Sequence, residues 1–174
     1  MNSPDIRDID PWFSKGLLLK ASKIHGLGLF TSANIASGKL ILTFGGCLLP
    51  LSNRRSTDVI PSTAIPLSEN IILAECTNAQ KDLSDYINHS CNPNIGFRDA
   101  ISIIAIKNIK KGEELVIDYA FWEVDPSWKL KHDCNCGNKN CRGTISGVDW
   151  KQIKSTHIHF NYLSPFLKRR IKIS

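Results

Sequence analysis

Hydrophobic residues in this chain form short clusters that are separated by turn-forming residues. The clearest clusters are rich in leucine, isoleucine and valine: Leu17–Leu19, Leu40–Phe44, Ile71–Ala74, Ile101–Ile106 and Leu115–Ile117. Glycine, proline and asparagine lie between them, as at Gly45-Gly46 and Asn92-Pro93. Many short strands spaced by turns predict a mainly β domain of several small sheets. Residues 48–66, which contain three prolines, are expected to form a loop-like insertion.

A helix is predicted only near the C-terminus. Ser164 can cap it and Pro165 can be its first residue, because proline lacks the N–H that the first turn leaves unpaired. The apolar residues that would share one face are Phe166, Leu167 and Ile171. The basic run at residues 168–170 is expected to form a solvated face near the negative end of the helix dipole.

Composition fits one globular domain. The 174 residues are 42% hydrophobic, and 22 lysines and arginines against 16 aspartates and glutamates give a net charge of +6. That charge suits an acidic or nucleic-acid-associated partner, although ordinary soluble domains often carry as much. The longest apolar stretch, residues 40–51, is too short to span a membrane, and the first fifteen residues hold three aspartates and do not resemble a secretory signal. We therefore expect a soluble intracellular protein without a membrane partner.

Three of the six cysteines crowd together as C-x-C-x4-C, at Cys134, Cys136 and Cys141. Reducing compartments disfavour disulfides, so thiols this close favour a zinc site over a redox or disulfide role. A tetrahedral site needs a fourth ligand. The residues that could supply it are His132, Cys91, Cys76 and Cys47.

Three further motifs carry candidate chemistry. Residues 25–30 hold glycines at positions 26 and 28, which allow a sharp turn or a close approach of backbone to a ligand; Thr31 stands where a dinucleotide fingerprint needs a third glycine. Residues 87–94, INHSCNPN, are unusually polar for a connector, although a glycosylation acceptor, an Asn-Pro turn or an ordinary histidine would also fit. Residues 112–121 predict a glycine turn and then a strand that ends in a tyrosine.

Together and in this order, the four motifs resemble the SET-domain protein-lysine methyltransferases with a post-SET zinc motif. The resemblance spans roughly residues 16–145 and implies a β-clip-like fold of small sheets with a knot-like threading of the third motif. The implied boundaries are a SET domain at 16–122 with an insertion at about 47–81, a post-SET zinc module at 130–146, and a C-terminal helical extension at 147–174.

The resemblance also implies a role for particular residues. Those expected to bind S-adenosylmethionine are Gly26, Leu27, Gly28, Asn88, His89, Tyr119 and Ile145, of which Ile145 would cover the adenine. Tyr119 matches the family's catalytic tyrosine. Cys91 would be the fourth zinc ligand beside Cys134, Cys136 and Cys141. The expected walls of the substrate channel are Phe44, Ile117 and Phe121.

The chain departs from the family's pattern at several positions. Phe44 stands where a tyrosine is common, so one hydroxyl of the active site is missing. Asp85 and Tyr86 replace a frequent arginine and phenylalanine. Ile117 stands where the family carries phenylalanine or tyrosine and tunes the number of methyl groups. Because Ile117 has no hydroxyl to hold a water, we expect di- or trimethylation.

The activity that the resemblance implies is transfer of a methyl group from S-adenosylmethionine to a lysine of a histone or another protein. The insertion and the segment from Trp150 onward are expected to select the substrate. The alternative is a catalytically weak or inactive zinc-containing SET module that binds chromatin or nucleic acid; for the enzyme, nucleic acid is expected as a partner only through chromatin. Nucleus, cytoplasm and secretion from a bacterium into a host cell all fit the sequence, as does any oligomeric state.

Overall fold

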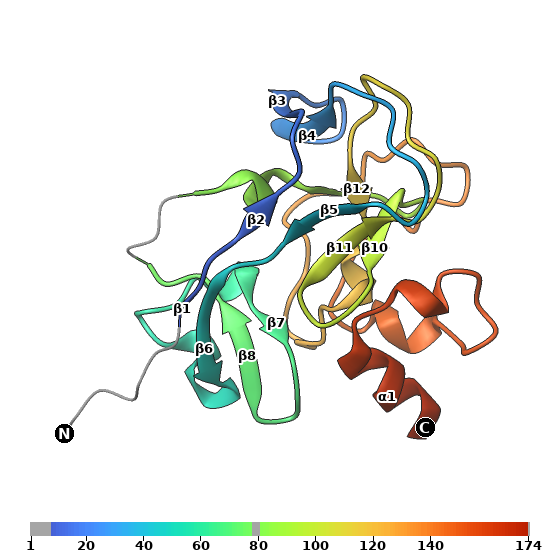
Figure 1. Ribbon diagram of the computed structural model, residues 1–174. Helices are drawn as coiled ribbons and strands as arrows, with labels where there is room; N and C mark the ends of the chain where they lie inside the picture. Colours follow the sequence, from blue (N-terminus) through green and yellow to red (C-terminus); the bar gives the residue numbers. More distant parts are fainter. Residues whose placement is uncertain (1–7, 78–80, 174) are drawn as a thin grey trace.

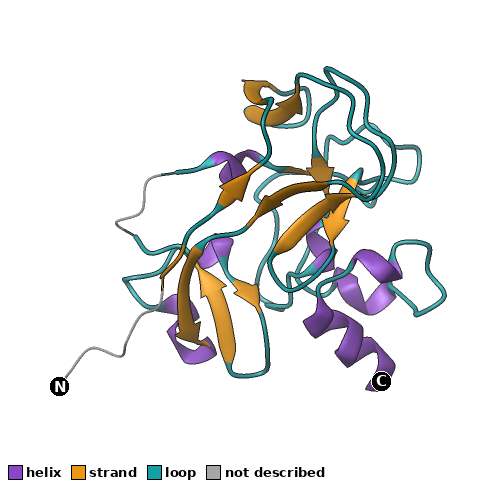
Figure 2. Cartoon of the chain, in the orientation of Figure 1, coloured by secondary structure: helices purple, strands orange, loops and turns teal. Residues whose placement is uncertain are grey.

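The computed structural model describes residues 8–77 and 81–173, and within them the strands form four small sheets (Figures 1 and 2). One sheet has the antiparallel order β1 (Asp8–Ile9), β6 (Gly46–Pro50), β8 (Ile71–Ala74) and β7 (Ile65–Pro66). A second has the antiparallel order β10 (Ile95–Phe97), β11 (Ser102–Ala105), β5 (Leu40–Thr43) and β2 (Trp12–Phe13). The two-stranded sheets are β3 (Leu17–Ala21) with β4 (Leu27–Thr31), and β9 (Asn88–His89) with β12 (Val116–Ile117). The expected mainly β architecture of several small sheets is confirmed.

Short 3-10 helices and one α-helix complete the described chain. The 3-10 helices are η1 (Leu51–Arg55), η2 (Pro61–Thr63), η3 (Leu83–Tyr86), η4 (Tyr119–Phe121), η5 (Asp149–Gln152) and η6 (Phe160–Tyr162). The α-helix, α1, spans Pro165–Ile173 and starts at the expected proline. The hydroxyl of Ser164 accepts a hydrogen bond from the backbone of Leu167, so the predicted cap is confirmed.

The basic run on α1 is only partly solvated, which corrects the expectation for it. Arg169 is exposed, but the Arg170 guanidinium lies 4.7 Å from the centre of the Phe166 ring and 5.9 Å from that of Trp150. Arg170 also forms an ion pair with Glu69, at 2.6 Å, in the turn between β7 and β8. An arginine packs its planar head on aromatic faces while remaining charged, and this arginine thereby joins the C-terminal helix to the insertion.

The expectation of a loop at residues 48–66 is correct only in part: the segment begins in β6 and ends in β7, and between these strands it forms η1, η2 and turns. In β6 the side chains of Cys47 and Leu49 are buried, and Leu48 pairs with Leu73 of β8. Both prolines in the sheet occupy positions where a missing N–H is tolerated: Pro50 ends β6, and Pro66 lies on the edge strand β7. Prolines alone therefore did not indicate a loop.

The insertion has a small core of its own. Its buried residues are Cys47, Leu49, Val59, Ala64, Ile72 and Ala74, and a disulfide joins Cys47 to Cys76. The larger core lies around β5, β10, β11 and β12 and includes the fully buried Phe97 and Phe121. In Figure 1 the hairpin of β7 and β8 and the helix α1 both lie below β5, β10 and β11, and the Arg170–Glu69 ion pair joins them. No helix in the described part of the chain is long and apolar enough to cross a membrane.

Candidate active site

The parallel pair β9 and β12 brings the second and third motifs side by side. Asn88 pairs with Val116, and His89 pairs with Ile117. Strands of two residues offer few ladder bonds, and the buried amide of Asn94 adds to them: its Oδ1 accepts from the backbone of Val116 at 2.8 Å and its Nδ2 donates to the carbonyl of Glu114 at 2.7 Å. Asn94, in the polar motif after β9, thus holds the backbone that leads to Tyr119.

Tyr119 begins η4, directly after β12 and the buried Asp118. Its backbone N–H donates to Nδ1 of His89 at 3.2 Å, and its hydroxyl donates to the carbonyl of Ile87 at 2.9 Å. Burial raises the pKa of Tyr119 to about 12, so the phenol keeps its proton at neutral pH. The arrangement suits a hydroxyl that positions and polarises other groups and does not suit a base.

His89 is neutral and holds one tautomer. Burial lowers its pKa to about 4, even though Asp118 lies nearby. Because Nδ1 accepts from the backbone of Tyr119, the ring proton is on Nε2, which lies 3.4 Å from the sulfur of Cys91. The histidine therefore bridges the tyrosine and the cysteine cluster.

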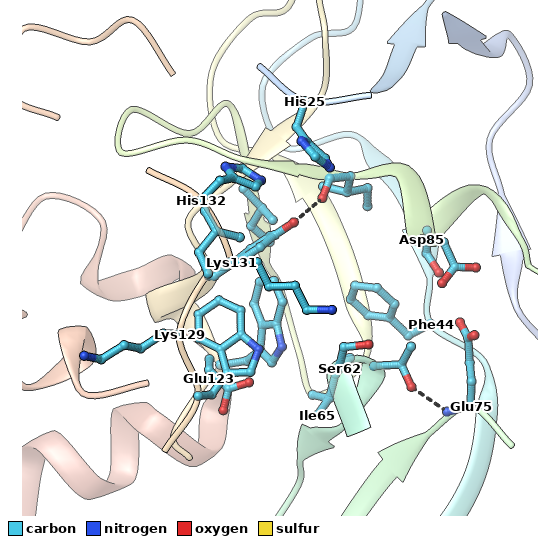
Figure 3. Close-up of a pocket in the computed structure, with 18 of the residues that line it drawn as sticks. His25, Phe44, Ser62, Ile65, Glu75, Asp85, Glu123, Lys129, Lys131 and His132 are labelled. Carbon is cyan, nitrogen blue, oxygen red and sulfur yellow. Dashed lines mark hydrogen bonds between the residues drawn. The ribbon is translucent and has the colours of Figure 1, made fainter. Parts of the chain in front are cut away.

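A cavity of about 440 Å³ opens beside Tyr119 (Figure 3). Its apolar walls include Phe44, Ile65, Ile87, Ile117, Trp122 and Trp128. Phe44 and Ile117 were predicted to line a substrate channel, and both line this cavity. Phe121 does not; it is fully buried against the ring of His159, and its neighbour Trp122 lines the cavity instead. The aromatic residues after Tyr119 were the sequence feature that could have indicated Trp122.

A second cavity, of about 50 Å³, adjoins the first. It is lined by Ile24, His25, Asn88, His89, Tyr119, Leu130, His132, Cys134 and Asn135. Tyr119 therefore lines both cavities, and the stacked rings of His25 and His132, 4.3 Å apart, also border both. The structure brings together three of the predicted cofactor residues here, whereas Ile145 is fully buried behind Leu130, whose N–H it accepts at 2.9 Å.

The predicted cofactor loop is held by a residue that the sequence reasoning missed, Glu114. Its Oε1 accepts from Nδ2 of Asn88 at 2.8 Å, and its Oε2 accepts from the hydroxyl of Ser22 at 2.9 Å. Nδ2 of Asn88 also donates to the carbonyls of His25 and Leu27, both at 3.1 Å. Because its nitrogen faces these acceptors, Asn88 retains Oδ1 as a free acceptor for a ligand: no residue in the described ranges donates to it.

The carboxylate of Glu114 explains why one of the two positions in the loop is a glycine. A Cβ placed on Gly28 would collide with Oε1 of Glu114, so any larger residue would displace the carboxylate. Gly26 has a different role: its φ of +49° lies in the left-handed region, and its carbonyl accepts from the backbone of Ser22. One glycine allows a turn and the other a close approach.

Four cysteine sulfurs lie within 4.8 Å of one another, those of Cys91, Cys134, Cys136 and Cys141. Of the fourth ligands that the sequence left open, Cys91 is therefore the one that joins the cluster. Cys47 and Cys76 are joined in the disulfide, and His132 stacks on His25. Four thiols that can approach one ion at about 2.3 Å are a typical donor set for structural zinc.

The cysteine segment is attached to the residue before Tyr119. Arg142 donates from Nη1 and Nη2 to Asp118, at 2.7 and 2.6 Å, and its Nε lies 3.2 Å from Asp149. Its backbone N–H also points at the sulfur of Cys91, 3.4 Å away. Two buried carboxylates and a sulfur thus meet at one arginine.

An acidic group borders the larger cavity on the side of the insertion. Carboxylate oxygens of Glu75, Asp82 and Asp85 lie within 4.8 Å of one another. Burial, together with repulsion from the two aspartates, raises the pKa of Glu75 to about 7. Figure 3 shows Glu75 and Asp85 on the opposite side of the cavity from Lys129.

Comparison with known proteins agrees with this geometry. Residues 26–120, more than half of the chain, match the family described as SET domain, so the chain belongs to the SET-domain family. It is 33% identical over 134 residues to "Histone-lysine N-methyltransferase 2B" of Homo sapiens, a match covering 70% of this chain and 5% of the relative. It is 27% identical over 161 residues to "Histone-lysine N-methyltransferase ATX2" of Arabidopsis thaliana, covering 84% of this chain and 14% of the relative. The chain thus spans only a small part of the curated relatives that it matches.

Proposed function

We propose that this protein transfers methyl groups from S-adenosylmethionine to lysine side chains of a protein substrate. The observation that carries the proposal is that Tyr119 lines two adjoining cavities, one apolar and one bordered by Asn88 and His89. A transfer between two bound molecules needs such a junction, because donor and acceptor must be held in line at near-attack distance. Membership of the SET-domain family and the names of the relatives support the same reaction.

The residues around the smaller cavity fit the donor. S-adenosylmethionine, when bound, supplies an electrophilic methyl on a sulfonium. Oδ1 of Asn88 is the acceptor for the ammonium of the donor's amino-acid part, since Nδ2 is engaged by Glu114 and the loop carbonyls. The backbone of Gly26, Leu27 and Gly28 flanks this acceptor, and the neutral ring of His89 adds no opposing positive charge.

The larger cavity suits a lysine that must lose its proton before it reacts. With a reference pKa of about 10.4, only about one lysine in 2500 is neutral at pH 7. The walls formed by Phe44, Ile117 and Trp122 disfavour the charged form by desolvation, which lowers the pKa of an inserted lysine. The hydroxyl of Tyr119 orients the reacting groups, and the proton leaves to water through the open side of the cavity.

We further propose that the product is di- or trimethyl-lysine. Phe44 and Ile117 both line the cavity and neither carries a hydroxyl that could hold a water in the space that added methyl groups need. Mass spectrometry of an unmodified lysine peptide after reaction tests this point. We expect Ile117→Tyr to shift the product towards monomethyl-lysine; a wild-type product that stops at one methyl group would contradict the proposal.

We propose a structural zinc ion at the four cysteines and a histone tail or another protein as the substrate. The cysteine set is complete without an open position, so the ion would not take part in the reaction. The insertion of β6–β8 and the segment from Trp150 onward meet at the ion pair of Glu69 and Arg170, and they are the surfaces that would contact the substrate around its lysine. Histone peptides are the first acceptors to try, because the relatives carry histone-lysine names.

Calorimetric titration of S-adenosylmethionine into the zinc-loaded protein tests the function without a known substrate. We expect saturable binding that Asn88→Ala weakens by about tenfold or more, since the variant loses a hydrogen bond to a charged group. Asn92→Ala, in the same motif but exposed, is the matched control and should bind as the wild type does. Absence of binding by a folded, zinc-loaded sample would overturn the proposal.

A further inference from the structure

A lysine of the chain itself borders the cavity that we assign to the substrate lysine. Lys131 lies in the segment between η4 and the cysteine cluster, and it lines the cavity together with Tyr119, Phe44 and Ile117. Figure 3 shows its side chain extending into the cavity, whereas the side chain of Lys129, two residues earlier, points away. The two lysines therefore differ in direction although they share a segment.

The backbone on both sides of Lys131 is anchored. On one side Leu130 donates to the carbonyl of Ile145 at 2.9 Å, next to the bridge between Lys129 and Ser146. On the other side Cys134 donates to the carbonyl of Gly143 at 2.8 Å. The position of Lys131 at the cavity thus follows from the fold of the segment.

No structural role accounts for this lysine. Its side chain is exposed, and within the described ranges no carboxylate pairs with it and no hydrogen bond holds its ammonium. By contrast, Lys168, on α1, donates to the carbonyl of Asn161 at 3.1 Å. A lysine whose flexible four-carbon stem enters this cavity without an ionic partner is placed as we propose for a substrate side chain.

We propose that Lys131 is a methyl acceptor in its own active site, so that the protein methylates itself in cis. This inference rests on the proposed methyltransferase function. The unprotonated Nζ of Lys131 attacks the methyl carbon of S-adenosylmethionine: the new N–C bond forms as the C–S bond breaks, and the bonding pair stays on sulfur. The products are S-adenosylhomocysteine and methylated Lys131, and the proton lost by the ammonium goes to water.

Tethering favours the reaction. The acceptor is tethered at the cavity, so the step has a high effective concentration and needs no encounter. Because both lysines use one cavity, self-methylation and substrate methylation exclude each other at any one moment.

The test is incubation of the wild-type protein with methyl-labelled S-adenosylmethionine and no other acceptor, followed by peptide mapping with tandem mass spectrometry. We expect methyl groups on Lys131. Lys131→Arg should lose the label, since its guanidinium stays protonated, and Lys129→Arg, the matched control, should keep it. The label per protein is expected to be unchanged on roughly hundredfold dilution, because an intramolecular step does not depend on protein concentration.

The outcomes separate this inference from the proposed function. If histone peptides are methylated by the same sample while Lys131 stays unmodified, the inference is overturned and the function stands. Label on other lysines only, or label that falls with dilution, also overturns it. If neither peptide nor protein is labelled and S-adenosylmethionine does not bind, the proposed function itself fails.

Discussion

The two terminal nitrogens of Arg142 donate hydrogen bonds of 2.7 and 2.6 Å to the carboxylate of Asp118. Arg142 directly follows the last cysteine of the cluster, and Asp118 directly precedes Tyr119. The side chain of Asp118 is only 6% exposed, and that of Arg142 is 24% exposed. The cysteine segment is therefore attached to the tyrosine by a bidentate ion pair as well as by Cys91, and the two attachments meet at one end of β12.

Arg142→Ala should destabilise the fold markedly. It leaves the charge of Asp118 buried without its main partner, which costs about 3 kcal/mol. Arg142→Lys keeps the charge but loses the pair of parallel donors, so its stability should lie between that of the wild type and that of Arg142→Ala. Denaturant unfolding measures the effect. Arg98→Ala is the control, because Arg98 and Asp99 form an exposed pair worth about 1 kcal/mol or less; equal losses at the two arginines would contradict this reasoning.

Zinc binding should depend on the four clustered cysteines and not on the two cysteines of the disulfide. We expect one zinc ion per chain by elemental analysis, lost in Cys136→Ser and retained in Cys47→Ser, whose cysteine belongs to the disulfide. Removal by a chelator should lower the melting temperature by roughly 10 °C, which corresponds to about 3 kcal/mol for a chain of this size. It should also weaken binding of S-adenosylmethionine, since Cys134 lines the smaller cavity. A chelated protein with unchanged melting would refute the structural site.

Glu114 and Gly28 should be energetically coupled. Glu114→Ala frees the Asn88 amide and should weaken S-adenosylmethionine binding by about tenfold. Gly28→Ala should do the same, because its methyl group would push the carboxylate away. The double variant should then resemble either single variant, and a double-mutant cycle on cofactor affinity measures this. Glu113→Ala, exposed on the same turn, is the control; strictly additive losses would show that the two residues act separately.

Tyr119 should affect rate much more than cofactor binding. Tyr119→Phe removes one positioned hydroxyl and should lower kcat by about 100-fold, with a change of less than about threefold in cofactor affinity. Because the pKa of Tyr119 is about 12, its proton is lost only as the pH rises towards that value. The kcat of the wild type should therefore rise with pH as lysine deprotonates, without a falling limb below pH 10 caused by this tyrosine. A limb near pH 8 that Tyr119→Phe abolishes would contradict this assignment.

Glu75 should make stability depend on pH. Its folded-state pKa of about 7 exceeds the reference value of 4.5, so the folded state holds the proton more tightly than the unfolded state does. This contribution is complete below pH 4.5 and is lost as the pH rises through 7. Glu75→Gln should therefore raise the melting temperature at pH 8.5 by about 2 °C, a modest value because the group is half exposed, and leave it unchanged at pH 4.5. An equal shift of the melting temperature at both pH values would refute this role of Glu75.

Local sequence was sufficient for the parts of the fold that depend on local physics. The clusters at Leu40–Phe44 and Ile71–Ala74 became β5 and β8, and the Ser164-Pro165 start of α1 was correct to the residue. The two ends of residues 48–66 were misjudged as loop, because prolines at a strand end and on an edge strand look like loop residues until their neighbours are known.

The candidate site shows the same division. Thiols close in sequence were enough to suggest zinc, and the cluster with Cys91 fits. Glu114 was missed because its partners Ser22 and Asn88 come from other parts of the chain, and nothing in its own neighbourhood marks it. Phe121 was expected in a channel wall with Phe44 and Ile117, but Trp122 lines the cavity with them, because a 3-10 turn after Tyr119 decides which side chain faces it.

The pairing of β9 with β12 has a consequence for folding. Two strands of two residues each have little stability of their own, and the chain that joins them forms the antiparallel pair β10 and β11. The loop-closure entropy of this pairing is thus offset by contacts made elsewhere in the core, and these contacts hold Tyr119 in place. Because no stable element of its own holds Tyr119, the order of the proposed reaction centre depends on the cooperativity of the whole domain.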